Sequence, residues 1–65
     1  MSYEAAMQTA KYAHVTGCPV QITHEGRSEW NAYFKSKPHA QTCYEELRAD
    51  SHEVTLEGDS MMRIK

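Results

Sequence analysis

The sequence predicts a two-layer α+β domain with the element order α-β-β-α-β-β, in which both helices cover one face of an antiparallel or mixed sheet. Two observations lead to this fold class. Two segments repeat apolar residues at helical spacing, and two others alternate apolar and polar residues around a short turn, as hairpins do. Each strand therefore has one apolar face, which leaves the other sheet face to water. The 65 residues are expected to form one small domain, residues 1–65.

The first helix is predicted over residues 3–15. Ser2 is a suitable cap for its start, and Glu4 places a favourable negative charge in its first turn. Gly17 supplies a left-handed stop, and Pro19 follows it. The face expected to pack against the sheet holds the residues at i, i+4, i+7 and i+11, which are Tyr3, Met7, Ala10 and His14.

From Val20 the apolar period changes to two, which predicts a β-hairpin. The alternating runs 20–25 and 30–35 are separated by a loop in which Gly26 can adopt a positive φ. The side chains expected to face the core are Val20, Ile22, Trp30, Ala32 and Phe34.

A second helix is predicted over residues 38–50, because Pro38 suits a first helical turn and a narrow apolar stripe follows it. A second hairpin then closes the chain around the turn 57–60. Together the segments predict a core of fifteen residues: Tyr3, Met7, Ala10, Val20, Ile22, Trp30, Ala32, Phe34, Cys43, Tyr44, Leu47, Val54, Leu56, Met62 and Ile64.

Size and composition point to function at the outer surface. A domain this small buries only about 60% of the surface of its unfolded chain, so an enclosed active site would remove much of its core. The composition, 40% apolar and 25% charged, indicates a folded chain, and the net charge of −2 argues against a strongly basic nucleic-acid binder. We therefore expect a non-enzymatic protein without a cofactor or catalytic residues.

Two cysteines are too few for a disulfide scaffold, and no apolar run reaches the length of a membrane span. A cytoplasmic protein with reduced thiols is the expectation. His39 and Cys43 lie at i, i+4 on the second helix, and Cys18 and His24 would have to complete a zinc site. Their spacing matches no usual zinc motif, so no metal site is predicted, although metal binding by these four residues stays open.

The distribution of charge suggests an interaction surface. The last 28 residues hold six acidic residues against three basic ones. Such a surface would bind a basic site on a larger protein partner by charge complementarity, and the chain would act stoichiometrically as an inhibitor or adaptor. Small inhibitors made by phages and other mobile elements share this character. The predicted partner-binding residues are Glu45, Glu46, Asp50, Glu53, Glu57, Asp59 and Tyr33.

Two further interactions are left open. A small nucleic-acid-binding or transcription-regulatory domain is the alternative, with phosphate contacts from three basic residues and base stacking on an aromatic one. Its residues would be Arg27, Lys35, Lys37 and Tyr33. A homodimer through an edge strand is also open, because edge strands present unpaired backbone groups.

The open face of the predicted sheet is polar but carries Tyr and Met, which are common in interfaces. Its residues are expected to be Gln21, Thr23, Asn31, Tyr33, Thr55 and Met61. The segment 19–27 looks like the strand and turn of Phd/YefM-type antitoxins over nine residues, but a helix stands where that family has a leading strand. We assign the chain to no family on this resemblance.

Overall fold

The computed structural model describes residues 2–65, with the Ser2 side chain left aside, so the expected Ser2 cap lies outside what is described. Six elements follow one another in the predicted order. They are α1 (Ser2–Thr16), β1 (Val20–His24), β2 (Trp30–Phe34), α2 (Lys37–Ala49), β3 (Val54–Glu57) and β4 (Met61–Ile64).

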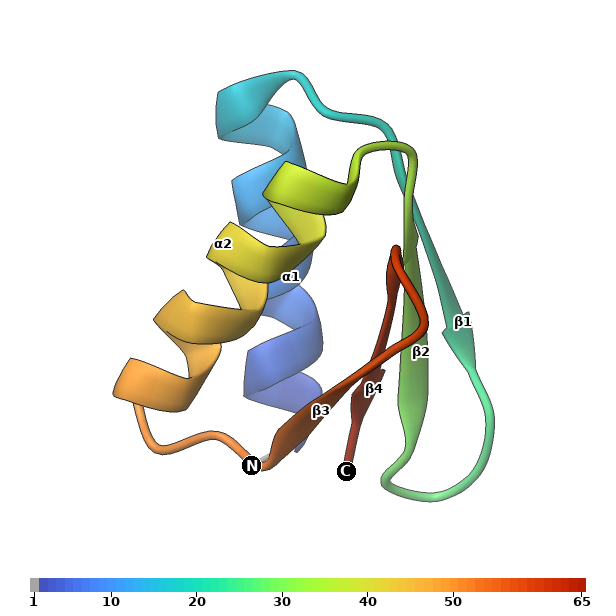
Figure 1. The fold of residues 1–65 in the computed structure, drawn as a ribbon. Coiled ribbons are helices and arrows are strands. Elements are labelled where there is room, and N and C mark those ends of the chain that lie inside the picture. The colour runs from blue at the N-terminus through green and yellow to red at the C-terminus, as the bar shows by residue number, and fades with distance from the viewer. Residues whose placement is uncertain (1) are drawn as a thin grey trace.

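The four strands form one sheet in the order β1-β2-β4-β3, and every neighbouring pair is antiparallel. Figure 1 shows both helices on the same side of this sheet. The predicted α+β fold is confirmed, and the sheet is antiparallel rather than mixed. Because β2 pairs with β4, the chain consists of two consecutive αββ units that meet in the middle of the sheet.

Strand register explains why one face of the sheet is apolar. Ile22, Ala32, Met62 and Leu56 lie opposite one another in a row across all four strands. Ala32 and Met62, in the middle of this row, are fully buried, whereas Ile22 and Leu56 on the edge strands are partly buried. The core therefore lies between the central strands and the helices.

The second helix buries the stripe that its sequence predicts. Ala40, Cys43 and Leu47 are buried, and Tyr44 packs against them at the edge of the core. The chain leaves the helix through Ser51, which has a φ of 66°, and the His52 N–H donates to the Leu47 carbonyl at 3.0 Å. This bond satisfies one of the carbonyls that a helix C-terminus leaves free.

The face predicted for the first helix is wrong. Tyr3 and Met7 are 60% and 55% exposed, and Ala10 and His14 are exposed as well. The residues that face the core are smaller: Ala5, Ala6 and Thr9 are buried, and Tyr12 packs against the core at its edge. The end of the helix agrees with the sequence, since Gly17 has a φ of 73°.

Two stripes with the same helical spacing explain this error. One carries Tyr3 and Met7, and the other carries Ala5, Thr9 and Tyr12. Small side chains let the helix approach the sheet closely, and the Thr9 hydroxyl donates to the Ala5 carbonyl at 2.8 Å, so its burial leaves no unpaired donor. Large apolar side chains are consequently left on the outer face of α1.

Candidate functional site

Three contacts hold the two helices together side by side. Gln8 Nε2 donates to Asp50 Oδ2 at 2.7 Å, Cys43 Sγ lies 4.0 Å from Thr9 Oγ1, and the Tyr12 hydroxyl lies 2.9 Å from His39 Nδ1. From the first of these pairs to the last, the residue number on α1 rises while that of its partner falls. The helices are therefore antiparallel, and the C-terminal half of α2 faces the N-terminal half of α1.

Between the helices the surface is hollowed into an open groove of about 630 Å³. Its walls come from side chains of both helices and of the residue that caps α2: Met7, Gln8, Lys11, Tyr12, Val15, Thr16, Glu46 and Asp50. The Gln8–Asp50 hydrogen bond crosses from one helix to the other at this groove.

The groove is bordered by apolar side chains that the fold does not cover. Met7 is 55% exposed and Val15 is 71% exposed, and Lys11 lies between them along the helix. Single exposed apolar residues are normal in soluble proteins, and here two of them lie beside one hollow. Tyr12 adds a half-buried aromatic wall.

The opposite side of the groove is acidic. Glu46 on α2 and Asp50, which caps the C-terminus of this helix, lie one helical turn apart and are both exposed. The Glu46 carboxylate makes no hydrogen bond or ion pair with any residue that the structure describes, whereas Asp50 accepts the bond from Gln8. Lys11 is the one basic residue lining the groove, so the charge there is negative.

The other predicted acidic residues lie elsewhere. Glu45 is exposed on α2, where Gln41 Nε2 donates to its Oε2 at 3.3 Å, and Glu53 is exposed in the link before β3. Glu57 is on the sheet face opposite the helices, and Asp59, in the β3–β4 turn, lies 3.7 Å from Lys37 Nζ. Of the six acidic residues, the structure brings only Glu46 and Asp50 together at the groove.

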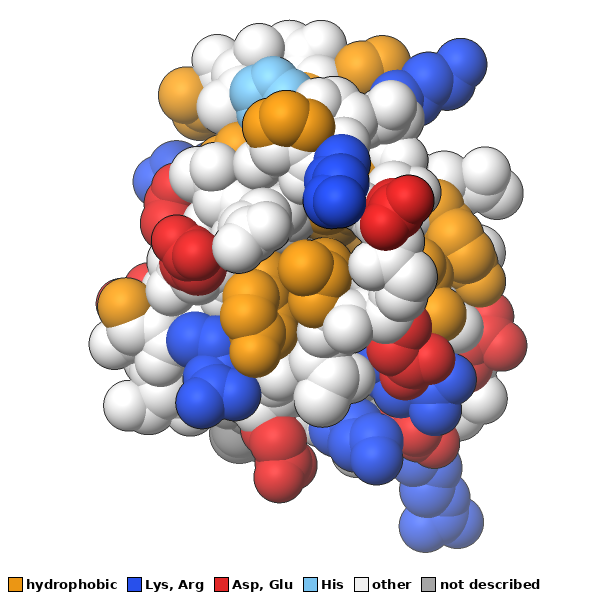
Figure 2. All heavy atoms as spheres, viewed as in Figure 1, with side chains coloured by type: hydrophobic (Ala, Val, Ile, Leu, Met, Phe, Trp, Pro, Cys, Tyr) orange, Lys and Arg blue, Asp and Glu red, His pale blue; other side chains and the backbone are white. Residues whose placement is uncertain are grey.

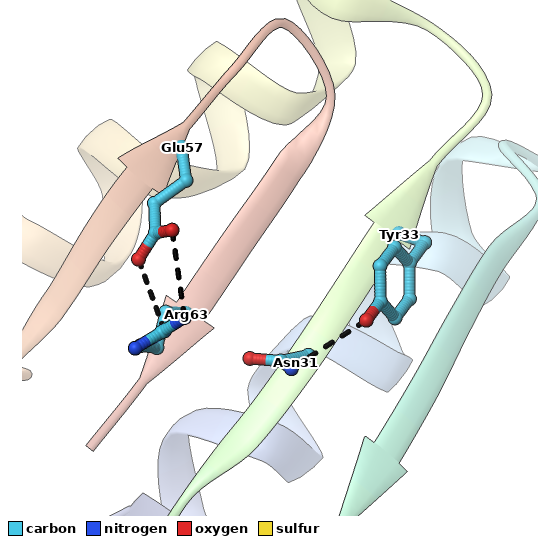
Figure 3. Close-up of polar contacts among 4 residues, drawn as sticks. All are labelled: Asn31, Tyr33, Glu57 and Arg63. Atoms are coloured by element: carbon cyan, nitrogen blue, oxygen red, sulfur yellow. Dashed lines mark hydrogen bonds and ion pairs between the residues drawn. The ribbon is translucent and has the colours of Figure 1, made fainter. Parts of the chain in front are cut away.

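The open face of the sheet carries the residues that the alternation predicts. Tyr33 is 43% exposed and lies opposite Gln21 on one side and Met61 on the other. Asn31 Nδ2 donates to the Tyr33 hydroxyl at 3.5 Å (Figure 3). Arg63, a residue that the sequence reasoning did not include, lies on this face and holds Glu57, with 3.0 Å between Arg63 Nε and Glu57 Oε2.

The basic residues of the nucleic-acid alternative do not form one cluster. Arg27 lies in the loop before β2 and Lys35 follows the end of the same strand, so the five residues of β2, roughly 17 Å, separate them. Lys37 is paired with Asp59. Arg27, Lys35 and Lys37 therefore do not gather around Tyr33 on the open sheet face.

The two His residues considered for zinc contact aromatic side chains, and the two Cys residues are buried. His24 stacks on Trp30 with 4.1 Å between ring centroids, and His39 contacts Tyr12. Cys18 and Cys43 are free and buried, and within residues 2–65 no three His, Cys, Asp or Glu side chains form a group that could hold a metal ion. Burial raises the pKa of the Cys43 thiol to about 11, which keeps this thiol neutral near pH 7.

A second apolar area contrasts with the groove. Figure 2 shows hydrophobic side chains in the middle of the face that carries α2 and β3, surrounded by charged ones. Tyr44 on α2 and Leu56 on β3 pack against the core, and Arg48 covers the Tyr44 ring with its Cζ 5.8 Å from the centroid. Its Nη1 also donates to the Tyr44 hydroxyl at 3.4 Å. Arg48 therefore shields this aromatic ring, whereas Met7 and Val15 are left open.

Comparison with protein-family models, with curated proteins and with solved structures found no match to this chain. None of the helices within residues 2–65 combines the length and apolar character needed to cross a membrane. The candidate site therefore depends on its own geometry and charge. Sequence reasoning found Glu46 and Asp50 but missed Met7, Lys11 and Val15, whose only signal was an apolar residue on each side of a lysine at i, i+4 and i+8.

Proposed function

We propose that this chain is a small, non-enzymatic protein-interaction domain that acts stoichiometrically, as an inhibitor or adaptor of a larger protein. It binds this partner through the α1–α2 groove, with Met7 and Val15 of α1 and the carboxylates of Glu46 and Asp50 in the interface. The partner presents a basic site, and binding takes place in the cytoplasm.

The observation that carries the proposal is the position of Met7 and Val15 beside Glu46 and Asp50 in one open groove. The apolar side chains lose water on binding, which favours association. The carboxylates attract a basic partner and exclude an acidic one, so they add speed of encounter and specificity. Neither pair is part of the core, and Asp50 is bound only by Gln8 at the surface, so both pairs are accessible to a partner.

The size of the domain limits the surface area that is available for binding. A typical specific interface covers about 800 Å² on each partner, and this is about a fifth of the 4265 Å² surface. The groove alone is smaller than that. We infer that neighbouring exposed residues of α1 and α2 form the rim of the interface.

Affinity purification from the native host with three forms of the domain tests this function. The first is the unchanged chain, and the second carries Glu46→Lys and Asp50→Lys. The third carries Glu25→Lys and Glu29→Lys, the same change of charge in the exposed β1–β2 loop. We expect a protein that the unchanged chain and the loop variant retain equally, and that the groove variant retains at least tenfold less.

Two results would overturn the proposal. One is a partner that all three forms retain equally, which would place the interface elsewhere. The other is no protein enriched by the unchanged chain from its own host, because a stoichiometric binder must have a partner there. Circular dichroism of each form checks that the substitutions leave the fold in place.

A further inference from the structure

We infer that the occupant of the α1–α2 groove is a short amphipathic helix of the partner, with apolar residues on one face and Lys or Arg along one flank. This inference rests on the proposed function and names the chemistry of the segment that the groove accepts.

The walls of the groove favour a helix over an extended strand. An extended peptide usually binds by pairing with free backbone N–H and C=O groups of the protein that it binds, as at a sheet edge. Within α1 and α2 these groups are used in the helices themselves, so the groove offers side chains only. A helix arrives with its own backbone hydrogen bonds made and needs side-chain contacts alone.

The dimensions agree with about three turns of helix. The residues of α1 along the groove run from Met7 to Thr16, which spans roughly 14 Å at the helical rise. The outer rim on α1 consists of Met7, Lys11 and Val15 at i, i+4 and i+8. A third helix laid along this rim would bury apolar side chains at i, i+3 or i+4, and i+7 against Met7, Tyr12 and Val15.

Charge fixes the composition and orientation of this helix. Glu46 and Asp50 lie one turn apart on one side of the groove, and Lys11 lies on the other. Basic residues one turn apart on the partner helix would meet both carboxylates, and an acidic residue on its other flank would meet Lys11. The reversed arrangement would place like charges together, which disfavours it.

The experiment uses three synthetic peptides of about 14 residues, a length of roughly 21 Å when helical. The first contains Leu and Lys at helical spacing, the second replaces every Lys by Glu, and the third has the Leu and Lys composition of the first in strict alternation. Methyl NMR spectra of the full chain report where each peptide binds, and titration gives the affinity.

We expect the helical Leu/Lys peptide to shift the methyl signals of Met7 and Val15 and to bind at least tenfold more tightly than the other two peptides. Glu46→Lys with Asp50→Lys should weaken it at least tenfold, and Glu25→Lys with Glu29→Lys should not. Equal affinities for the three peptides, or shifts confined to Met61 and Thr55 on the open sheet face, would overturn the inference.

The outcomes separate this inference from the proposed function. If the native partner depends on Glu46 and Asp50 but the helical Leu/Lys peptide does not bind the groove, the function stands and the helical occupant is wrong. If the peptide binds the groove but the native partner is insensitive to both carboxylates, the peptide chemistry stands and the proposed function is wrong.

Discussion

The two helices of this domain use their apolar residues differently. On α2, the stripe of Ala40, Cys43 and Leu47 is buried, and Arg48 covers the neighbouring Tyr44. On α1, Ala5, Ala6 and Thr9 face the core, while Met7 and Val15 are more than half exposed. Leu47 and Tyr44 of α2 therefore pack in or against the core, whereas Met7 and Val15 of α1 are left on the surface.

Under the proposed function, this difference allows a small domain to keep an interaction surface without losing its core. Small residues on the inner face of α1 let the helix lie close to the sheet, so the outer face can carry apolar side chains. The four substitution experiments below separate these roles, and the expected loss of stability decreases from one to the next.

The largest loss is expected from Leu47→Ala on α2. Leu47 is fully buried, and its truncation removes apolar contacts and leaves a cavity. We expect the free energy of unfolding to fall by about 2–5 kcal/mol. Urea denaturation followed by circular dichroism measures this, and a change below about 1 kcal/mol would contradict the assignment of Leu47 to the core.

A matched pair on α1 tests which of its faces is closely packed. Ala5→Leu adds volume at a position with no exposed surface, and Ala10→Leu adds the same volume on the exposed face. We expect Ala5→Leu to reduce the free energy of unfolding by about 1–3 kcal/mol, because overpacking displaces the helix from the sheet. Ala10→Leu should stay within about 0.5 kcal/mol of the unchanged chain. Thermal melts of the two variants in parallel make the comparison, and equal losses would contradict it.

The contrast between these two alanines also shows what could be predicted from sequence. Both stripes of α1 have helical spacing. The sequence prediction assigned the stripe with the larger apolar residues, Tyr3 and Met7, to the core, but this stripe is the exposed one. On α2 one stripe dominates, so the buried residues Cys43 and Leu47 were predicted correctly. All six elements were predicted because their periods of 3.6 and 2 are local properties of the chain.

The site depends on relations that a sequence pattern does not contain. The alternation along β3 already places Glu57 on the sheet face opposite the helices, but only the antiparallel packing of the helices brings Asp50 to Gln8. These contacts separate the acidic residues that lie close together in the sequence. Edge-strand dimerisation and nucleic-acid binding stay predictions, with β1 and β3 as the sheet edges.

Alkaline pH should weaken the interface between the helices. The pKa of Cys43 is raised by burial from 9.0 to about 11, and burial also raises the pKa of Tyr12 above 10.0. The fold favours the protonated forms, so this contribution to stability is complete below pH 9 and is lost as the pH rises through 11. We expect the free energy of unfolding to decline across this range.

Urea titrations at several pH values measure this decline. Cys43→Ala serves as the matched variant, because it removes one of the two groups and should make the decline less steep whatever its effect at neutral pH. An identical slope in both proteins would show that the Cys43 thiol does not contribute.

The smallest change in stability is expected from Met7→Ser combined with Val15→Ser. The fold leaves both side chains more than half exposed, so the double variant should remain within about 1 kcal/mol of the unchanged chain. Its binding to the helical Leu/Lys peptide and to the native partner should nevertheless fall at least tenfold, because the apolar rim of the groove is lost.

Urea denaturation of this double variant gives its free energy of unfolding. This value tests most directly the claim that the fold does not depend on the outer face of α1. We expect a value within about 1 kcal/mol of the unchanged chain. A loss of more than about 2 kcal/mol, comparable to truncation of a buried side chain, would contradict the claim and make Met7 and Val15 part of the core.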